Sequence, residues 1–419
     1  MTKLAQNGRA PNDVISELRA KRSADADWAN GRTFGMVYDG GADVHRVAEE
    51  AAALFLHENA LNTRAFPSLA SIQSEVVQWT SGLLHGGPEV VGFLTSGGTE
   101  SVLCAVVAAR ERGRIERGIT APEMVLAESA HAAFHKAAHL FGVVVRKTPV
   151  CNDWTADVDA MAAAVNENTV LVVGSAPQYP QGVVDPIPAI AALAATVGAN
   201  CHVDACMGGF VLPFAEMLGR DVPPWDWRVD GVTSISADIH KLGYAPKGVS
   251  VIAYRSKRDR AYQTFAFDDW LGGFYASPNL QGTRAGMPMA AAWAVMQHLG
   301  VDGYVQLTRS TLETADRIRA AISATPGLRV LGNGGYHLVT IAADPGFDGD
   351  PLDVFALGDA LQAKGWFCDR QGPPDSLHCT VSFGNAAVVD DYIAALAAAV
   401  DEIRGTQVDD RSTNYSTME

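Results

Sequence analysis

The chain has 419 residues, of which 48% are hydrophobic and 19% charged, a balance typical of a globular protein with a substantial core and more than one domain. Its formal net charge of −15 argues against a nucleic-acid partner, because neutralising phosphates requires clustered Lys and Arg. The six cysteines lack disulfide or metal spacing, and no signal core or apolar run of about 18 residues is present, so we expect a cytoplasmic protein without an integral membrane segment.

The first 60 residues are predicted to form an N-terminal arm and a helix. Residues 1–30 are polar, which is typical either of an arm that crosses to a partner subunit or of a mobile end. A Gly-rich loop at 31–44 presents Tyr38, and apolar residues then recur at helical spacing from Val44 to Asn59.

Residues 61–300 are predicted to form a large α/β domain. A helix from Ser71 to Leu84 precedes a region in which apolar runs alternate with helical patterns, and this alternation favours a mostly parallel sheet covered on both faces. The strands are expected at the start of 90–113 and at 124–129, 143–150, 169–177, 199–206, 231–238 and 249–255, and the helices in the rest of 90–113 and at 131–141, 155–166 and 187–198.

The remainder of the chain is predicted to form a small α+β C-terminal domain at 301–405. An aromatic and Gly-rich stretch at 262–288 ends the alternation, and helices are expected at 289–300 and at about 302–324. Strand, helix, strand and helix then follow over 328–343, 352–367 and 376–401, and residues 406–419 form a polar tail.

A turn of small residues, SGGTES at 96–101, joins a predicted strand to a helix. Backbone N–H groups at such a helix start form an anion site, and glycines allow close approach of a ligand. An equally good interpretation is a turn that only caps the helix, with Ser96 or Thr99 as the N-cap residue.

Two further polar residues follow predicted strands. Asp204 ends the apolar run in HVDACMGGF, where an unpaired carboxylate would be costly, so we expect it to have a cationic or hydrogen-donating partner. The alternative is a purely structural carboxylate that caps the next helix or pairs with an arginine. His131 lies at a strand-to-helix junction, where its ring could stack on a flat ligand. His135 and His139 recur at helical spacing from it, but no carboxylate or Cys shares their face, so no metal is expected.

Lys241 follows the strand predicted at 231–238 and lies between His240 and a Gly-rich turn. Lysine forms a Schiff base with a carbonyl when its surroundings lower its pKa, although a lysine at a strand end taken alone is more often a surface charge. With the anion site, Asp204 and His131 at the same edge of one sheet, the combination predicts pyridoxal 5′-phosphate (PLP) as the cofactor.

The segments TSGGTES, GSAPQYPQGVVDPIP, HVDACMGGF, VTSISADIHKLGYAPKG and DDWLGGFYASP occur in the order and spacing of a known family. They resemble the sphingosine-1-phosphate lyase family, among the group II decarboxylase-like enzymes of fold type I. The resemblance implies the fold-type I PLP-dependent transferase fold, with a mostly parallel large domain and a small α+β domain. It also implies a homodimer with shared active sites and a soluble, bacterial-type form without a membrane anchor.

The same resemblance implies a set of site residues. Lys241 would carry the cofactor, Asp204 would face its ring nitrogen and His131 would stack on the ring. The implied cofactor-binding residues are Lys241, Asp204, His131, Gly98, Thr99, His240 and Cys206. The implied catalytic residues are Lys241, Tyr179, Lys247 and His131, and the substrate contacts are Tyr38, Lys247 and Asn62.

Asn62 departs from the family pattern, in which this position is usually a histidine thought to help hold the substrate phosphate. An amide cannot supply that positive charge. The retro-aldol cleavage of a phosphorylated long-chain base into a fatty aldehyde and phosphoethanolamine is the predicted reaction. The alternatives are a PLP-dependent L-amino-acid decarboxylase or β-hydroxy amino acid aldolase, with Arg284 as the candidate carboxylate ligand, and a catalytically idle scaffold.

Overall fold

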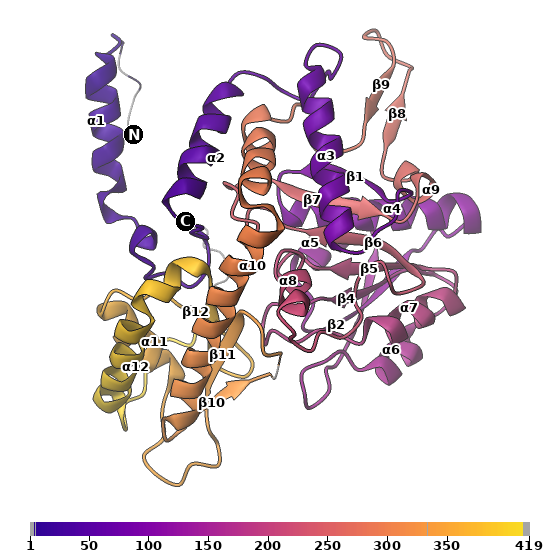
Figure 1. The fold of residues 1–419 in the computed structure, drawn as a ribbon. Helices are drawn as coiled ribbons and strands as arrows, with labels where there is room; N and C mark the ends of the chain where they lie inside the picture. The colour runs from indigo at the N-terminus through magenta and orange to yellow at the C-terminus, as the bar shows by residue number, and fades with distance from the viewer. Residues whose placement is uncertain (1–3, 5, 333, 414–419) are drawn as a thin grey trace.

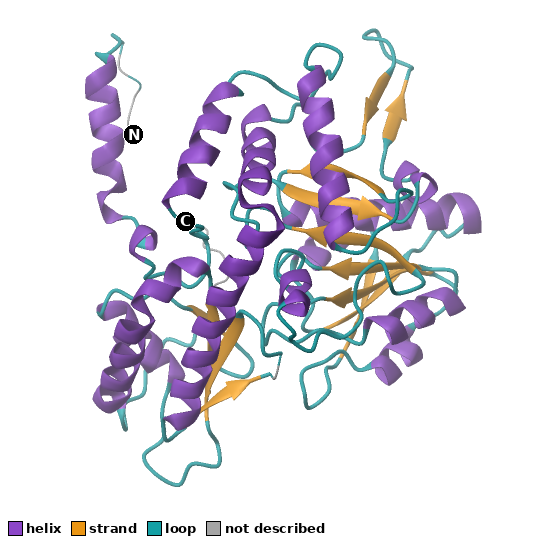
Figure 2. Ribbon diagram, in the orientation of Figure 1, coloured by secondary structure: helices purple, strands orange, loops and turns teal. Residues whose placement is uncertain are grey.

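A seven-stranded sheet forms the centre of the molecule in the computed structural model, which describes residues 4, 6–332 and 334–413 (Figures 1 and 2). The strands are arranged in the order β1-β7-β6-β5-β4-β2-β3. Only β7 runs antiparallel to its neighbours, so the predicted mostly parallel sheet is confirmed. The seven predicted runs form β1 (Val91–Thr95), β2 (Glu123–Ala127), β3 (Val144–Thr148), β4 (Thr169–Ser175), β5 (Asn200–Asp204), β6 (Val232–Ala237) and β7 (Ser250–Tyr254).

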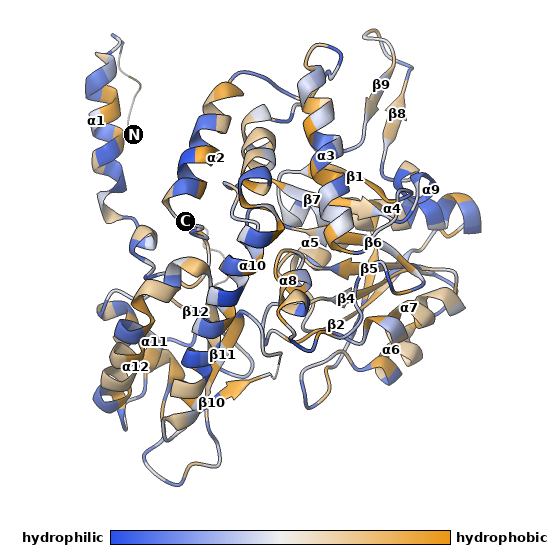
Figure 3. Ribbon diagram, in the orientation of Figure 1, coloured by the Kyte–Doolittle hydropathy of each residue, from blue (hydrophilic) through white to orange (hydrophobic). Residues whose placement is uncertain are grey.

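Helices cover both faces of this sheet, as the continuous apolar strands predict. In β2, Met124 and Leu126 pack in the core under α4 and α5, whereas Val125 packs in the opposite core, because successive strand residues face opposite sides. Figure 3 shows the apolar residues concentrated in these central elements. The helices between the strands are α4 (Gly98–Arg117), α5 (Ala133–Phe141), α6 (Val158–Ala164), α7 (Ile187–Thr196), α8 (Leu212–Met217) and α9 (Lys257–Ala261).

A long helix, α10 (Gly286–Ala324), joins two hydrophobic cores. Its residues up to Leu312 pack in the large core with α2 (Ala42–Leu54) and α3 (Pro67–Leu83), and its later residues pack in a second core. Gly300 has φ 54° and ψ −172°, which breaks the helix between the two segments predicted from the sequence. α10 therefore sets the position of the second core relative to the sheet.

The second core belongs to a four-stranded antiparallel sheet in the order β10-β11-β13-β12, with β10 (Leu328–Leu331), β11 (Leu338–Ala343), β13 (Ser376–Thr380) and β12 (Asp369–Gln371). It packs with α11 (Val354–Ala363) and α12 (Val389–Ile403). The single strand expected over 328–343 was wrong: Gly332 and Gly335 have positive φ and allow the chain to reverse there. β12 was not predicted, and the boundaries proposed for the domains stay a prediction.

Residues Phe383–Ile403 are the helical stretch among the described residues that length and a mean hydropathy of 1.3 would allow to cross a membrane. This stretch comprises the 3₁₀ turn Phe383–Val388 and α12. Tyr392, Leu396 and Val400 on α12 are buried in the second core. These three apolar side chains of α12 therefore pack within the protein.

Two peripheral elements expose apolar side chains. The polar N-terminal region contains a helix, α1 (Pro11–Lys21), which buries none of its residues and stands apart from the main body in Figure 1. Short 3₁₀ turns at Arg22–Ala24 and Trp28–Asn30 connect α1 to the rest of the chain. The second element is the hairpin of β8 (Phe265–Phe267) and β9 (Tyr275–Ser277), which projects from the large sheet.

Candidate active site

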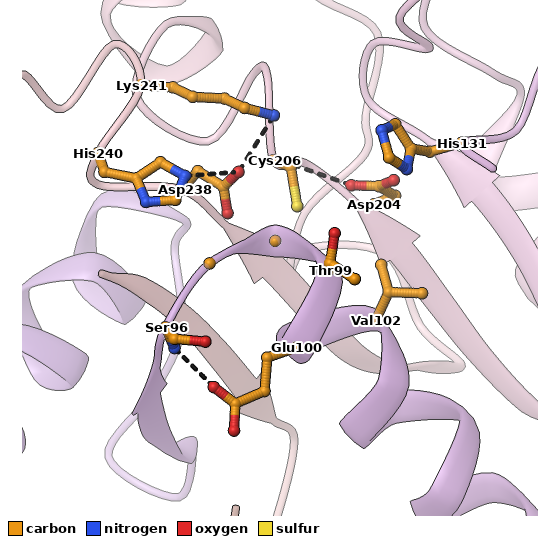
Figure 4. Close-up of a pocket in the computed structure, with 12 residues that line it drawn as sticks. Ser96, Thr99, Glu100, Val102, His131, Asp204, Cys206, Asp238, His240 and Lys241 are labelled. Atoms are coloured by element: carbon orange, nitrogen blue, oxygen red, sulfur yellow. Dashed lines mark hydrogen bonds and ion pairs between the residues drawn. The ribbon is translucent and has the colours of Figure 1, made fainter. Parts of the chain in front are cut away.

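A cavity of about 310 Å³ lies at the edge of the large sheet where several strands end (Figure 4). Because β1, β2, β5 and β6 point the same way, residues that follow these strands meet at one edge. The cavity is lined by Ser96, Gly97, Gly98, Thr99, Glu100, Val102, His131, Asp204, Cys206, Asp238, His240 and Lys241.

Lys241 enters the cavity from the turn after β6 and forms an ion pair with a buried carboxylate. Its Nζ lies 3.1 Å from Oδ2 of Asp238, and Nε2 of His240 lies 3.5 Å from the same oxygen. Burial raises the pKa of Asp238, but the charge of Lys241 and the hydrogen bond from His240 outweigh it, so the pKa of Asp238 lies well below its usual range. Asp238 was not predicted, although its i,i+3 spacing from Lys241 was a usable signal.

The turn that carries Lys241 is held by packing on both sides of it. Ile239 and Leu242 are buried in the large core, and the two side chains between them, His240 and Lys241, line the cavity. A Cβ on Gly243 would lie 2.5 Å from the carbonyl oxygen of Ile239, and the carbonyl of Gly243 accepts a hydrogen bond of 2.9 Å from the Tyr304 hydroxyl of α10. The hydrophobic neighbours of Lys241 thus have a positioning role.

The start of α4 lines the cavity beside Lys241 and forms a cradle of backbone groups. A Cβ on Gly98 would lie 2.7 Å from Oδ2 of Asp238 and 2.8 Å from Sγ of Cys206, so only glycine fits there. Gly97 caps the helix without a side-chain hydrogen bond, which shows that the alternative of Ser96 or Thr99 as N-cap was wrong. The backbone N–H groups at this helix start are therefore suited to an anion.

Glu100 holds this cradle in place and was missed from the sequence. Its buried carboxylate accepts hydrogen bonds from the backbone N–H groups of Ser96 at 2.6 Å, Leu280 at 3.1 Å and Gln281 at 3.3 Å. It thereby joins the turn before α4 to the segment after the β8–β9 hairpin. The sequence signal for Glu100 was an acidic residue in the first turn of a helix. Its partners Leu280 and Gln281 could not be predicted, because they lie far away in the chain.

Asp204 lies at the opposite side of the cavity, at the end of β5, and is buried (Figure 4). Its Oδ1 accepts hydrogen bonds from the backbone N–H of Cys206 at 3.1 Å and from the Ser236 hydroxyl at 3.3 Å. His131 stands nearby, and burial is the main cause that lowers the pKa of its imidazole. Its Nδ1 accepts a hydrogen bond from the backbone N–H of Ala133, so Nε2 carries the proton of the neutral ring.

Lys247 and Tyr38 lie together but are not among the residues that line this cavity. The Lys247 Nζ is 4.5 Å from the centroid of the Tyr38 ring and donates a hydrogen bond to the carbonyl of His240 at 3.1 Å. Although part of the Lys247 side chain is exposed, the local burial of its amine and the charge of Lys241 lower the pKa of Lys247 to about 8.

Two other predicted residues have different surroundings. The Tyr179 hydroxyl donates a hydrogen bond of 2.8 Å to Asp369 on β12, and its ring lies on that of His378, with centroids 4.0 Å apart. Asn62 is exposed in the loop between α2 and α3, where its side-chain oxygen accepts the N–H of Arg64 at 3.0 Å. Neither is among the residues that line the cavity within this subunit.

The chain matches a family model and two kinds of known protein. Residues 23–341 match the pyridoxal-dependent decarboxylase conserved domain. The sphingosine-1-phosphate lyase of Oryza sativa subsp. japonica is 40% identical over 401 residues, which cover 94% of this chain and 73% of that protein.

Among solved structures, the sphingosine-1-phosphate lyase of Burkholderia pseudomallei is 40% identical, with a TM-score of 0.91 over 96% of this chain and 93% of that one. Glutamate decarboxylase from Lactobacillus brevis, at 20% identity and a TM-score of 0.85 over 97% and 96% of the two chains, shares the fold. The chain therefore belongs to the pyridoxal-dependent decarboxylase family and, within it, to the sphingosine-1-phosphate lyases.

Proposed function

We propose that this PLP-dependent lyase cleaves a phosphorylated long-chain base into a fatty aldehyde and phosphoethanolamine. The main support is the likeness of nearly the whole chain to sphingosine-1-phosphate lyases. The cavity supports the same reaction class, because an amine, a carboxylate and a helix start with room for an anion meet there.

The residues of the cavity fit PLP. The helix start at Gly98 and Thr99, with His240 beside it, offers N–H donors for the phosphate, and the absent side chain of Gly98 lets this helix start pack closely on Asp238 and Cys206. Asp204 offers a buried carboxylate for the ring nitrogen, and the flat ring of His131 lies next to it. Lys241 offers the amine for the aldehyde, and Cys206 lines the floor of the cavity between them.

When bound, PLP supplies an electron sink for the charge that develops on the substrate carbon next to the amine. Asp204 would favour that chemistry, because the negative charge of its buried carboxylate would stabilise a protonated ring nitrogen beside it. Of the three candidates for proton transfer, Lys241 lines the cavity, whereas Tyr179 and Lys247 are not among the residues that line it in this subunit. We therefore assign proton transfer at the reacting carbon to the Lys241 amine, with Tyr179 and Lys247 as substrate contacts.

Lys247 and Tyr38 are the candidates to bind the substrate phosphate. A lysine ammonium is a phosphate ligand, and the adjacent tyrosine can donate its hydroxyl. Arg284, the candidate for an amino-acid carboxylate, donates instead to Gln73, at 2.6 Å, and to the carbonyls of Leu94 and Ala60. These contacts favour the lyase over the decarboxylase, and the exposed Asn62 leaves Lys247 as the stronger phosphate ligand.

We also infer a cytoplasmic homodimer with shared active sites. The β8–β9 hairpin exposes a group of large apolar side chains, and such patches mark protein interfaces. α1 exposes Val14, Ile15 and Leu18, so the N-terminal arm is our candidate for the segment that crosses to the partner. The exposed hairpin residues are Phe265, Phe267, Trp270, Leu271 and Phe274. All six cysteines are free thiols, as a reducing compartment favours.

The reaction is tested by incubating the PLP-loaded protein with sphingosine 1-phosphate and measuring long-chain aldehyde. We expect aldehyde formation with the natural chain and no multiple turnover with Lys241→Ala, because the amine that holds the cofactor is lost. Lys364→Ala, which removes a lysine paired with Glu402 on α12, is the control that should keep activity. Release of carbon dioxide from L-amino acids without any aldehyde would contradict the proposal.

Replacement of Gly98 tests the phosphate cradle. Gly98→Ala should weaken PLP binding at least about tenfold, because the new methyl group meets Asp238 and Cys206 at less than van der Waals distance. Gly82→Ala on α3 is the matched control, since a Cβ there meets nothing within 4 Å. Binding is measured by quenching of tryptophan fluorescence, with circular dichroism as a check of folding; equal affinities for both variants would show that the cradle does not hold the cofactor.

The lowered pKa of Lys247 predicts a specific pH dependence. Because its charged form is lost as the pH rises through about 8, kcat/KM for the phosphorylated substrate should fall above that pH. In Lys247→Arg the guanidinium stays charged, so the decline should move to higher pH. If kcat/KM declines at the same pH in Lys247→Arg as in the natural chain, Lys247 does not bind the substrate phosphate.

The dimer is tested by sedimentation of the natural chain and of Leu271→Asp. Leu271 is fully exposed in the hairpin, so a charge there leaves the packing of the subunit intact but disrupts an interface that covers it. We expect a dimer for the natural chain and a larger monomer fraction for Leu271→Asp. Ile115→Asp on α4 is the exposed control, and a monomeric natural chain would overturn the inference.

A further inference from the structure

A row of buried polar side chains lies behind Asp204, on the same face of two adjacent parallel strands. His202 and Asp204 are two residues apart on β5, and Ser234 and Ser236 are two residues apart on β6. The register places His202 opposite Ser234, and Asp204 opposite Ser236. His202, Ser234 and Ser236 are at most 1% exposed, so each hydrogen bond among them is made without bulk water.

The distances connect these side chains into one chain of contacts. Nδ1 of His202 lies 2.8 Å from the Ser234 hydroxyl, and Nε2 lies 3.2 Å from the Ser236 hydroxyl. The Ser236 hydroxyl in turn lies 3.3 Å from Oδ1 of Asp204. The row therefore ends on the carboxylate that faces the cavity.

The number of protons that each group can donate determines which atom is the donor in each hydrogen bond of the row. An ionised Asp204 can only accept, so the single hydroxyl proton of Ser236 is donated to it. Oγ of Ser236 then acts as the acceptor, both for the Cys206 thiol at 3.3 Å and for His202, which places the imidazole proton on Nε2. Nδ1 is left as the acceptor for the Ser234 hydroxyl, and every bond points toward Asp204.

The charge of His202 is consistent with this direction. Burial lowers the pKa of His202 to about 4, against the opposing effect of Asp204, so the imidazole is neutral near pH 7. Phe134 packs edge-on against the ring, with centroids 5.9 Å apart, and restricts its rotation. A neutral imidazole held in one orientation can hydrogen-bond to Ser236 and so to Asp204. It does not bring a positive charge that would compete with the ring nitrogen of the cofactor for the Asp204 carboxylate.

We propose that His202 and Ser236 are positioning residues that hold Asp204 as an oriented anion through a one-way hydrogen-bond relay. Donation to Oδ1 fixes the orientation of the carboxylate, so that its other oxygen can accept from a protonated ring nitrogen of the cofactor. The relay also holds Asp204 in place at the cavity edge. This role rests on the proposed binding of PLP, but the tautomer of His202 does not.

The first test needs no activity and uses the full chain with and without PLP. A ¹⁵N spectrum of histidine-labelled protein, with His202 assigned by its absence in His202→Gln, should show a neutral ring protonated at Nε2. A proton on Nδ1, or a charged ring at pH 7, would overturn the relay. Failure of the natural chain to bind PLP would instead count against the proposed function, so the two failures are distinguishable.

The second test compares two buried serines that bond the same imidazole. Ser236→Ala should weaken PLP binding and lower kcat by about tenfold each, with little change in KM, because the donor to Asp204 is lost. Ser234→Ala removes a hydroxyl at the far end of the relay and should change both by less than about threefold, at a similar loss of thermal stability.

If Ser236→Ala and Ser234→Ala change PLP binding and kcat equally, the buried residues serve only the packing of the sheet, and the proposal is overturned. Thr80→Val, which removes a buried hydroxyl bonded to the Val76 carbonyl within α3, controls for the general cost of such a change. If Ser236→Ala does not fold, Ser236→Cys provides the same comparison, because a thiol of similar size is a weak donor.

Discussion

The ion pair between Lys241 and Asp238 is the interaction on which the site depends. Both groups lie at the end of β6, and Asp238 is almost completely buried. Removing one partner of a buried pair typically costs about 3–5 kcal/mol, because the remaining charge is left uncompensated. The pair therefore holds the lysine at the sheet edge and the aspartate under the start of α4, where the cofactor phosphate is expected.

Backbone and side chains approach each other closely around this pair, and this explains why glycine is required in the neighbouring turns. Gly98 brings α4 against Asp238 and Cys206, and Gly243 brings the lysine turn against Ile239. Glu100 and Tyr304 then tie these turns to segments far away in the chain, the hairpin region and α10. The site is thus a set of short turns held by long-range hydrogen bonds on a rigid sheet.

The large sheet and the residues directly after its strands could be predicted from the sequence. Lys241, Asp204, His131 and Thr99 each follow an apolar run, and parallel strands bring such positions together without any knowledge of packing. The role of Asp238 was not predicted, although it lies next to the Lys241 motif, because a carboxylate three residues before a lysine has many possible roles. The contact of Tyr179 with Asp369 joins residues 190 positions apart, and no local pattern reports it.

The sequence by itself determined the fold class, the cofactor and the identity of the principal charged groups, because periodic apolar runs and strand-end motifs are local features. Only the tertiary structure decided what surrounds these groups. It showed that Arg284 is engaged by backbone carbonyls, that Lys247 lies on Tyr38, and that His202 and Ser236 stand behind Asp204. The physical reason is that burial, pKa and hydrogen-bond direction depend on which strands and domains pack together, and a single chain segment does not contain that information.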